Sequence, residues 1–190
     1  MQHIEPYYNW RHLYRVEEDS KSPFFGKEYS EFEYSETIYN FYIHPQWDYF
    51  GSNTLYQKIL VADYKSQYAI IELLGEWNDV IENDIMFLKR NVIDVMVSNG
   101  ICKFILIGDN VLNFHASDNC YYEEWFEDII DEGGWMVAIN LRNHVVKEMK
   151  TENIHYYLQM GEQFNDIPWR QYRPQHLVQV VEDRIMKVLG

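Results

Sequence analysis

The sequence predicts an α/β fold with a mostly parallel sheet of about four strands, an antiparallel hairpin strand before it and flanking helices. Three observations predict this class. Short apolar runs rich in β-branched residues alternate with segments whose apolar residues recur at helical spacing. The first two apolar runs are close together, as in a hairpin. The later runs are separated by helix-length segments, and strands joined by such long connections return parallel.

The hairpin is expected from residues 55–63 and 68–74, and the second strand ends at Gly75. Asn78 or Asp79 is then positioned to accept a hydrogen bond from the first free N–H groups of a helix. Apolar residues at three- and four-residue spacing continue this helix to about residue 98, where Asn-Gly ends it.

The remaining elements follow the same alternation of apolar run and amphipathic segment. Residues 101–107 are almost continuously apolar, as expected for a strand buried on both faces. After it we expect a helix at about 119–131, a strand at 135–141, a short helix capped by Asn143, a last strand at about 154–160, and a closing helix that Pro174 opens.

Residues 1–53 differ from the rest of the chain because they have no clear period and many aromatic side chains. A packed aromatic ring buries about 150–250 Å², so we expect this extension to lie on the domain or in a dimer interface. The sequence thus predicts an aromatic-rich extension at residues 1–53 and one domain at residues 54–190. The aromatics of the extension are Tyr7, Tyr8, Trp10, Tyr14, Phe24, Phe25, Tyr29, Phe32, Tyr34, Tyr39, Phe41, Tyr42, Trp47, Tyr49 and Phe50.

Charge and composition limit the classes of partner. A formal charge of −14 argues against nucleic acid or an anionic membrane surface, since both attract a positive face. Cys102 and Cys120 show neither disulfide nor zinc spacing, which is typical of reduced cysteines. No apolar run approaches the about 20 residues that cross a bilayer, and the first residues lack the pattern of a signal peptide. We therefore expect a cytoplasmic protein without a metal or cofactor.

The joints between these elements resemble those of STAS domains, the fold named for sulfate transporters and anti-sigma-factor antagonists. Gly75-Glu76-Trp77-Asn78 resembles the Gly-Glu-Leu-Asp-like turn of that family. Residues 114–119, Phe-His-Ala-Ser-Asp-Asn, stand where the family has an aromatic residue and then Asp-Ser-Ser-Gly. Residues 139–145 resemble its Val-Asn-Leu-Ser-Pro-x-Val pattern. The resemblance covers about 135 residues and implies a STAS-like fold.

The resemblance also implies a function, namely a non-catalytic protein-interaction module in cytosolic regulation. Ser117 matches the phosphoacceptor serine of the phosphoregulated members, while Ala116 and Asp118 depart from the family pattern. The other interpretation of Ser117 or Asp118 is a simple helix cap. Glu123, Glu124 and Glu127 lie on the helix that follows this loop and form the expected partner surface. The expected partner is another protein, either basic or a regulatory kinase-like protein.

Two other functions stay open at this point. One is a small-molecule binding protein or enzyme with a pocket between the N-terminal extension and the sheet, since aromatic walls with polar tips describe ligand sites. The other is a homodimer in which the extension serves assembly. A rival dinucleotide- or nucleotide-binding sheet lacks support, because no segment fits Gly-x-Gly-x-x-Gly or the Lys-containing phosphate loop.

Overall fold

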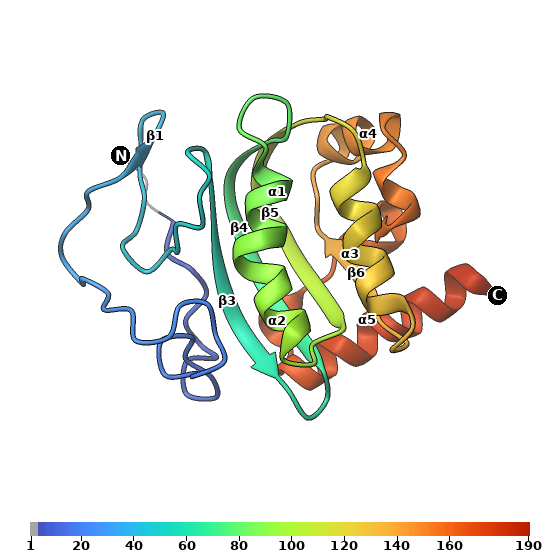
Figure 1. Cartoon of the computed structure of the whole chain (residues 1–190), viewed down its shortest axis with the longest axis horizontal. Helices are drawn as coiled ribbons and strands as arrows, with labels where there is room; N and C mark the ends of the chain where they lie inside the picture. Colours follow the sequence, from blue (N-terminus) through green and yellow to red (C-terminus); the bar gives the residue numbers. More distant parts are fainter. Residues whose placement is uncertain (1–3) are drawn as a thin grey trace.

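The centre of the protein is a five-stranded sheet with the order β3-β4-β5-β6-β7, seen in a computed structural model that describes residues 4–190 (Figure 1). β3 is antiparallel to β4, and each later neighbour pairs in parallel. The predicted fold class is therefore confirmed. The strands are β3 (Leu55–Asp63), β4 (Tyr68–Asn78), β5 (Lys103–His115), β6 (Trp135–Ile139) and β7 (Leu158–Gln159).

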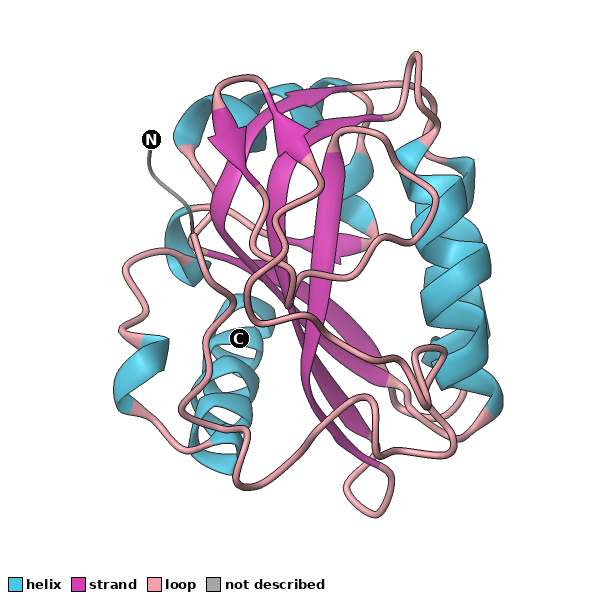
Figure 2. Ribbon diagram, turned by 90° about the vertical axis from the view of Figure 1, so that its left-hand side faces the viewer, coloured by secondary structure: helices cyan, strands magenta, loops and turns pink. Residues whose placement is uncertain are grey.

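Helices cover both faces of the sheet (Figures 1 and 2). One face packs on a continuous helical segment at residues 84–98 and on two further helices, and the opposite face packs on the last helix and on part of the N-terminal segment. This two-sided burial explains why the strands are nearly continuous apolar runs. The helices are α1 (Asp84–Leu88), the π-helix η1 (Lys89–Ile93), α2 (Asp94–Ser98), α3 (Cys120–Ile130), α4 (Asn143–Thr151) and α5 (Pro174–Leu189).

Three single-turn 3₁₀ helices complete the C-terminal half: η2 (Ile154–Tyr156), η3 (Glu162–Phe164) and η4 (Trp169–Gln171). The expectation of a strand at 154–160 was wrong over its first half. Asn153 has a left-handed backbone with φ of 58°, which starts the turn of η2, and only Leu158–Gln159 pairs with β6.

The expected turn at Gly75 was also wrong, because β4 continues through it to Asn78. The sheet shifts its register between Gly75 and Glu76, and the strand then pairs with the end of β5 as far as His115. Gly75 has φ of 124°, a conformation that glycine adopts without strain, so it supplies an irregularity within the strand instead of ending it. The helix therefore begins at Asp84, later than expected. Asp79 still accepts a hydrogen bond from the N–H of Ile85, in the first turn of that helix.

Residues 4–53 form mostly irregular structure that lies beside β3 (Figure 1). The regular part is a small hairpin of β1 (Thr37–Ile38) and β2 (Phe41–Tyr42). The expected burial of its aromatics holds for Trp10, Trp47 and Phe50, which are buried. Others are exposed to solvent, and they include Tyr8, Phe25, Phe32, Tyr39 and Tyr49. The division into an aromatic-rich extension at residues 1–53 and one domain at residues 54–190 stays a prediction.

Candidate functional site

The loop between β5 and α3 contains Ser117 and Asp118, at the carboxyl end of two parallel strands. Asp118 is exposed, and its Oδ1 accepts a hydrogen bond from the N–H of Cys120 at 3.1 Å. Hydrogen bonds from Cys120 hold the pKa of the Asp118 carboxyl below its ordinary value. This local contact joins Asp118 to the first residue of α3, whereas Asn119, the residue directly before the helix, makes no side-chain capping hydrogen bond. Ser117 is half-buried, and its hydroxyl makes no hydrogen bond within residues 4–190.

A shallow hollow lies next to this loop, between the β4–α1 connection and the start of α3. The exposed side chains of Val80 and Ile81, with 60% and 79% of their surfaces accessible, lie at this hollow. Two apolar side chains on a loop that also faces Tyr121 are the kind of group that an interface buries. The lining residues are Asp79, Val80, Ile81, Asn83, Ile85, Ser117, Asp118 and Tyr121.

The floor of the hollow is held by the buried carboxyl group of Asp79. It accepts hydrogen bonds from Trp77 Nε1 at 2.9 Å and from the Tyr122 hydroxyl at 2.6 Å, besides the one from Ile85 N–H at 2.9 Å. Burial raises the pKa of this carboxyl to about 7. Trp77 belongs to β4 and Tyr122 to α3, so Asp79 joins the strand, the connection and the helix. The connection that carries Val80 and Ile81 is therefore fixed at both ends.

The three glutamates of the expected partner surface lie on α3 but differ in their surroundings. Glu123 accepts a hydrogen bond from the Tyr157 hydroxyl at 2.9 Å. Glu124 is bound by both Nη atoms of Arg90, with the second contact at 2.8 Å, so its charge is already engaged within the protein. Glu127 is exposed and makes no ion pair within the described chain. Glu123 and Glu127 are thus the more available of the three.

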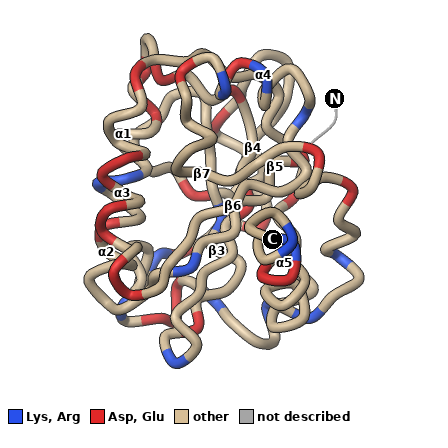
Figure 3. Tube along the Cα trace, turned by 90° about the vertical axis from the view of Figure 1, so that its right-hand side faces the viewer, with Lys and Arg blue, Asp and Glu red and all other residues tan. Residues whose placement is uncertain are grey.

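A buried lysine lies between α3 and the preceding helical segment. The side chain of Lys89 is only 1% exposed, and its Nζ contacts the carboxylates of Asp94, Glu124 at 3.4 Å and Asp128 at 2.7 Å. Figure 3 shows that red, acidic segments predominate along α2 and α3, with a short blue, basic segment among them. Sequence reasoning missed this cluster, because Lys89 sits inside an amphipathic helical pattern and looks like an ordinary solvent-facing lysine.

A third polar cluster lies at the same end of the sheet. Glu76 of β4 pairs with His115 of β5, with 2.9 Å between Oε1 and Nε2, and its other oxygen accepts a hydrogen bond from the Tyr39 hydroxyl of the β1–β2 hairpin. These contacts bring the N-terminal hairpin next to the strand that leads to Ser117. The sequence signal was present only as an isolated His115, with nothing to indicate its partner.

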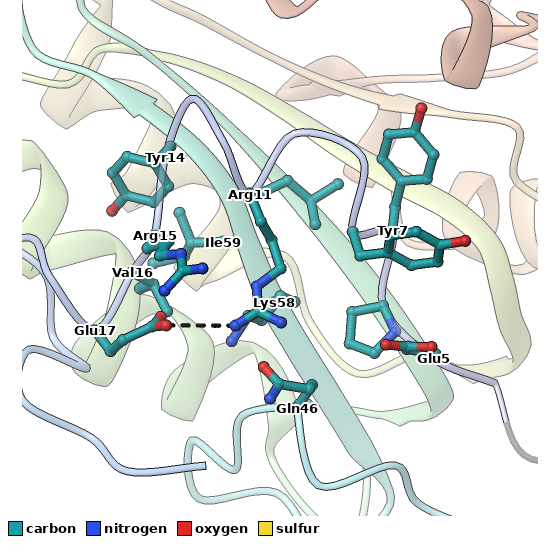
Figure 4. A pocket seen from close by; sticks show the side chains of 13 residues that line it. Glu5, Tyr7, Arg11, Tyr14, Arg15, Val16, Glu17, Gln46, Lys58 and Ile59 are labelled. Atoms are coloured by element: carbon teal, nitrogen blue, oxygen red, sulfur yellow. Dashed lines mark ion pairs between the residues drawn. The ribbon is translucent and has the colours of Figure 1, made fainter. Parts of the chain in front are cut away.

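A small hollow of about 20 Å³ lies between the N-terminal segment and β3 (Figure 4), and a ligand pocket at this place stays a prediction. Figure 4 shows the Arg11 guanidinium over Lys58, with the ion pair between Arg11 and Glu17 at 3.7 Å. Lys58 is buried, and burial lowers the pKa of its ammonium to about 8. Its Nζ lies 3.6 Å from Asp48 and 3.8 Å from the centre of the Tyr29 ring. The charges at this pocket are therefore largely paired with one another.

The described residues contain no group of three or more His, Cys, Asp and Glu side chains placed to hold a metal ion. No helix in that part of the chain combines the length and the apolar character needed to cross a membrane.

Comparison with known proteins adds solved structures of similar architecture. No family model and no curated protein sequence matches the chain. The unphosphorylated anti-sigma factor antagonist SpoIIAA is similar over 67% of this chain and 96% of its own, with a TM-score of 0.48 and 9% identity. The phosphorylated form of SpoIIAA, the Bacillus cell fate determinant, covers 66% of this chain and 98% of its own, with a TM-score of 0.42 and 9% identity. The strand order and directions agree with the predicted STAS-like fold, and likeness at this level of identity gives no information on function.

Proposed function

We propose that the chain is a non-catalytic, STAS-like protein-interaction module that acts in cytosolic regulation. The observation that carries the proposal is the pair of exposed apolar side chains, Val80 and Ile81, beside the Ser117–Asp118 loop. An exposed apolar group next to charged residues has the composition of an interface, in which a buried apolar centre is surrounded by a polar rim. In this proposal Val80 and Ile81 form the centre, and Asp118, Glu123 and Glu127 form the rim.

The rim charges indicate the chemistry of the partner. Carboxylates of one sign speed the approach of a basic protein surface and determine specificity more than affinity, so binding is expected to weaken at high salt. A regulatory kinase-like protein is the alternative partner. Phosphorylation of Ser117 is a further part of the proposal: it would add about −1.5 to −2 charges beside Asp118 and strengthen the attraction to a basic partner.

The test compares partner capture by the wild-type chain with capture by surface variants. A cross-linked native extract is analysed by mass spectrometry with the wild type, with V80S/I81S and with E123K/E127K. Met186→Ser is the matched control, because Met186 is an exposed apolar side chain on α5, which packs on the opposite face of the sheet. We expect both double variants, but not the control, to lose the same partner. Retention of that partner by both double variants at wild-type yield would overturn the proposal.

Glu124 is left out of that variant because Arg90 binds it. We expect Glu124→Lys to reduce the stability of the protein, since it places a third cation beside Arg90 and Lys89, so loss of capture in that variant would not report on the interface. Ser117→Asp is expected to have a smaller effect on capture than V80S/I81S, because Asp118 already places a negative charge at that loop.

The second candidate function is binding of a small molecule in the pocket of Figure 4, and the specific observation is Lys58. Its buried Nζ makes no hydrogen bond although it lines a pocket that also contains Arg11 and Arg15. A panel of small carboxylates and phosphates, tested for stabilisation of the wild type and of Lys58→Met, separates the two functions. Stabilisation of the wild type alone would favour the small-molecule function. No stabilisation of either protein leaves the interaction function as the better supported one. The homodimer alternative is tested by light scattering, where a mass of 23.1 kDa indicates a monomer.

A further inference from the structure

We propose that the β1–β2 hairpin forms a second docking surface, which takes a basic peptide segment of a partner with one large apolar side chain. The inference rests on the proposed function only in expecting a protein partner, and it concerns different residues. It is carried by an apolar pocket under the hairpin, by exposed aromatic rings around it and by an excess of carboxylates in the same segment.

The pocket lies where the hairpin meets the ends of β4 and β5. Ile38, Ile43 and Leu74 are buried and form its floor, while Phe41 and Tyr42 at its rim keep 40% and 42% of their surfaces exposed. An apolar hollow of about 40 Å³ with an exposed aromatic rim is suited to the end of one aliphatic or aromatic side chain, whose remainder packs on the rim, and such a side chain usually anchors a peptide in a groove. Its lining consists of Ile4, Ile38, Phe41, Tyr42, Ile43, Leu74, Gly75 and Leu112.

The pocket is already formed in the absence of a ligand. Tyr39, at the tip of the hairpin, has φ of 53°, which is rare for a bulky residue, and its hydroxyl donates to Glu76 of β4. Trp47 Nε1 donates to the carbonyl of Ile4 at 2.6 Å, which fixes the other wall. A strained turn that is tied to the sheet lowers the ordering cost when a peptide binds.

The charge of the segment determines what such a peptide must carry. Residues 28–57 contain no Lys or Arg, whereas the exposed stretch before the hairpin contains Glu28, Glu31, Glu33 and Glu36. None of these four carboxylates forms an ion pair within residues 4–190. Phe32 adds an exposed ring with 86% of its surface accessible. Unpaired carboxylates attract Lys and Arg, and exposed rings add cation–π contacts with them.

The same charges argue against a second copy of this chain as the occupant. The formal charge of −14 makes two copies repel each other, and this segment has no cation to contribute to a symmetric contact. A partner segment with several Lys or Arg residues fits both the carboxylates and the rings. The surface therefore differs from the Val80–Ile81 site, where the exposed side chains are aliphatic.

The probe for this surface is a library of random 12-residue peptides displayed on phage and selected on the whole chain. The selected peptides are then synthesised with a fluorescent label and measured by anisotropy at low and high salt. We expect them to carry Lys or Arg beside one Trp, Phe or Leu, and to bind F41S/Y42S at least about tenfold more weakly. E31Q/E33Q/E36Q is expected to bind more weakly as well, with a smaller salt dependence.

Three controls separate this inference from folding defects and from the proposed function. Phe25→Ser removes an exposed ring that does not line the pocket and should leave peptide binding unchanged. Denaturant unfolding of F41S/Y42S checks that the fold is retained, and Phe41→Ser alone provides a second rim variant if it is not. V80S/I81S should still bind the peptides while losing the native partner. Selection of peptides without basic residues, of none at all, or of peptides indifferent to both rim variants would overturn the inference.

Discussion

The backbone N–H of Tyr7 donates to Oε2 of Glu72 at 2.8 Å, which ties the N-terminal segment to a carboxyl group in the middle of the sheet. Glu72 is only 1% exposed, and burial raises the pKa of its carboxyl to about 7. Arg170, with Nη2 at 3.6 Å from Oε1, lowers that pKa and Asp109 raises it. Across the hairpin Glu72 is opposite Lys58, another buried charge. A partly exposed arginine and a backbone N–H thus offset only part of the cost of burying the carboxylate.

This arrangement predicts a pH dependence of stability that Glu72→Gln removes. The folded-state pKa of Glu72 lies above the ordinary 4.5. Its contribution to the stability of the folded protein is therefore fully present below pH 4.5 and is lost as pH rises to about 7. The difference amounts to at most about 3.5 kcal/mol, at about 1.4 kcal/mol per pKa unit. We expect the variant, which keeps an acceptor for Tyr7, to be more stable than the wild type at pH 8 and to differ little at pH 4.5. Denaturant unfolding at both pH values measures the free energy of unfolding of the two proteins. If that free energy changes equally with pH in both, Glu72 does not have this role.

Lys89→Met is expected to destabilise the protein. The substitution keeps the apolar stem but leaves three carboxylates, each between 34% and 41% exposed, without their buried cation, and loss of such charged hydrogen bonds costs about 1.5–3 kcal/mol. Arg90→Met is the matched control, since Arg90 contacts two of the same carboxylates from a half-exposed position and should cost about 1 kcal/mol or less. The free energy of unfolding of each variant gives the comparison. Similar losses would mean that burial of Lys89 has no special role.

Lys89 also shows where sequence reasoning reaches its limit. The helical segment at 84–98 could be predicted in its apolar part, because Ile85, Leu88 and Val92 recur at helical spacing and are buried. The partners of Lys89 could not be predicted, since two of its three carboxylates are 35 and 39 residues away on another helix. Local periodicity identifies which face of an element is buried. It does not identify which charges of different elements meet there.

The candidate site also contains some features that the sequence predicts and others that it does not. The order of elements placed Ser117 and Asp118 in a loop before α3, as observed. Val80 and Ile81 were not singled out, because the sequence pattern assigned them to a helix that would bury Ile81. The connection at 79–83 instead leaves the sheet later than expected, since β4 runs on past Gly75, and this delay exposes both side chains. An irregular connection of this kind depends on tertiary pairing with β5 and has no local signature.

Removing residues 1–52 is expected to cause aggregation or a large loss of stability. Trp10 is buried and packs edge-on against Trp169, with 5.7 Å between ring centres, and Tyr7 packs against the same ring at 4.9 Å. Exposing such a face costs about 1.5–3 kcal/mol for each large apolar side chain. Trp10→Ala should already cost about 3–5 kcal/mol, whereas Phe32→Ala, at an exposed ring of the same segment, should cost little. Light scattering and unfolding curves provide the readout, and a soluble truncated chain of unchanged stability would show that the segment is dispensable.

Gly75→Ala tests whether the backbone of β4 needs a glycine where the strand changes register. A Cβ at this position would lie 2.1 Å from the Thr54 carbonyl oxygen and 3.0 Å from Cδ1 of Ile38, and φ is 124°. The nearer atom belongs to the backbone of Thr54, directly before β3, so it cannot move aside as a flexible side chain would. We therefore expect the free energy of unfolding to fall by more than about 2 kcal/mol. Gly26→Ala is the control, since φ is also positive there, at 73°, but no atom lies within 4 Å of the added Cβ. That variant should cost about 1 kcal/mol, the cost of the backbone conformation alone.

Unfolding measurements of both variants separate the cost of the contact from the cost of the backbone conformation. Proteolysis of the Gly75 variant should cut the β1–β2 hairpin first, because Ile38 of β1 packs on this glycine. Equal losses in the two variants would show that contact with Thr54 does not constrain the strand.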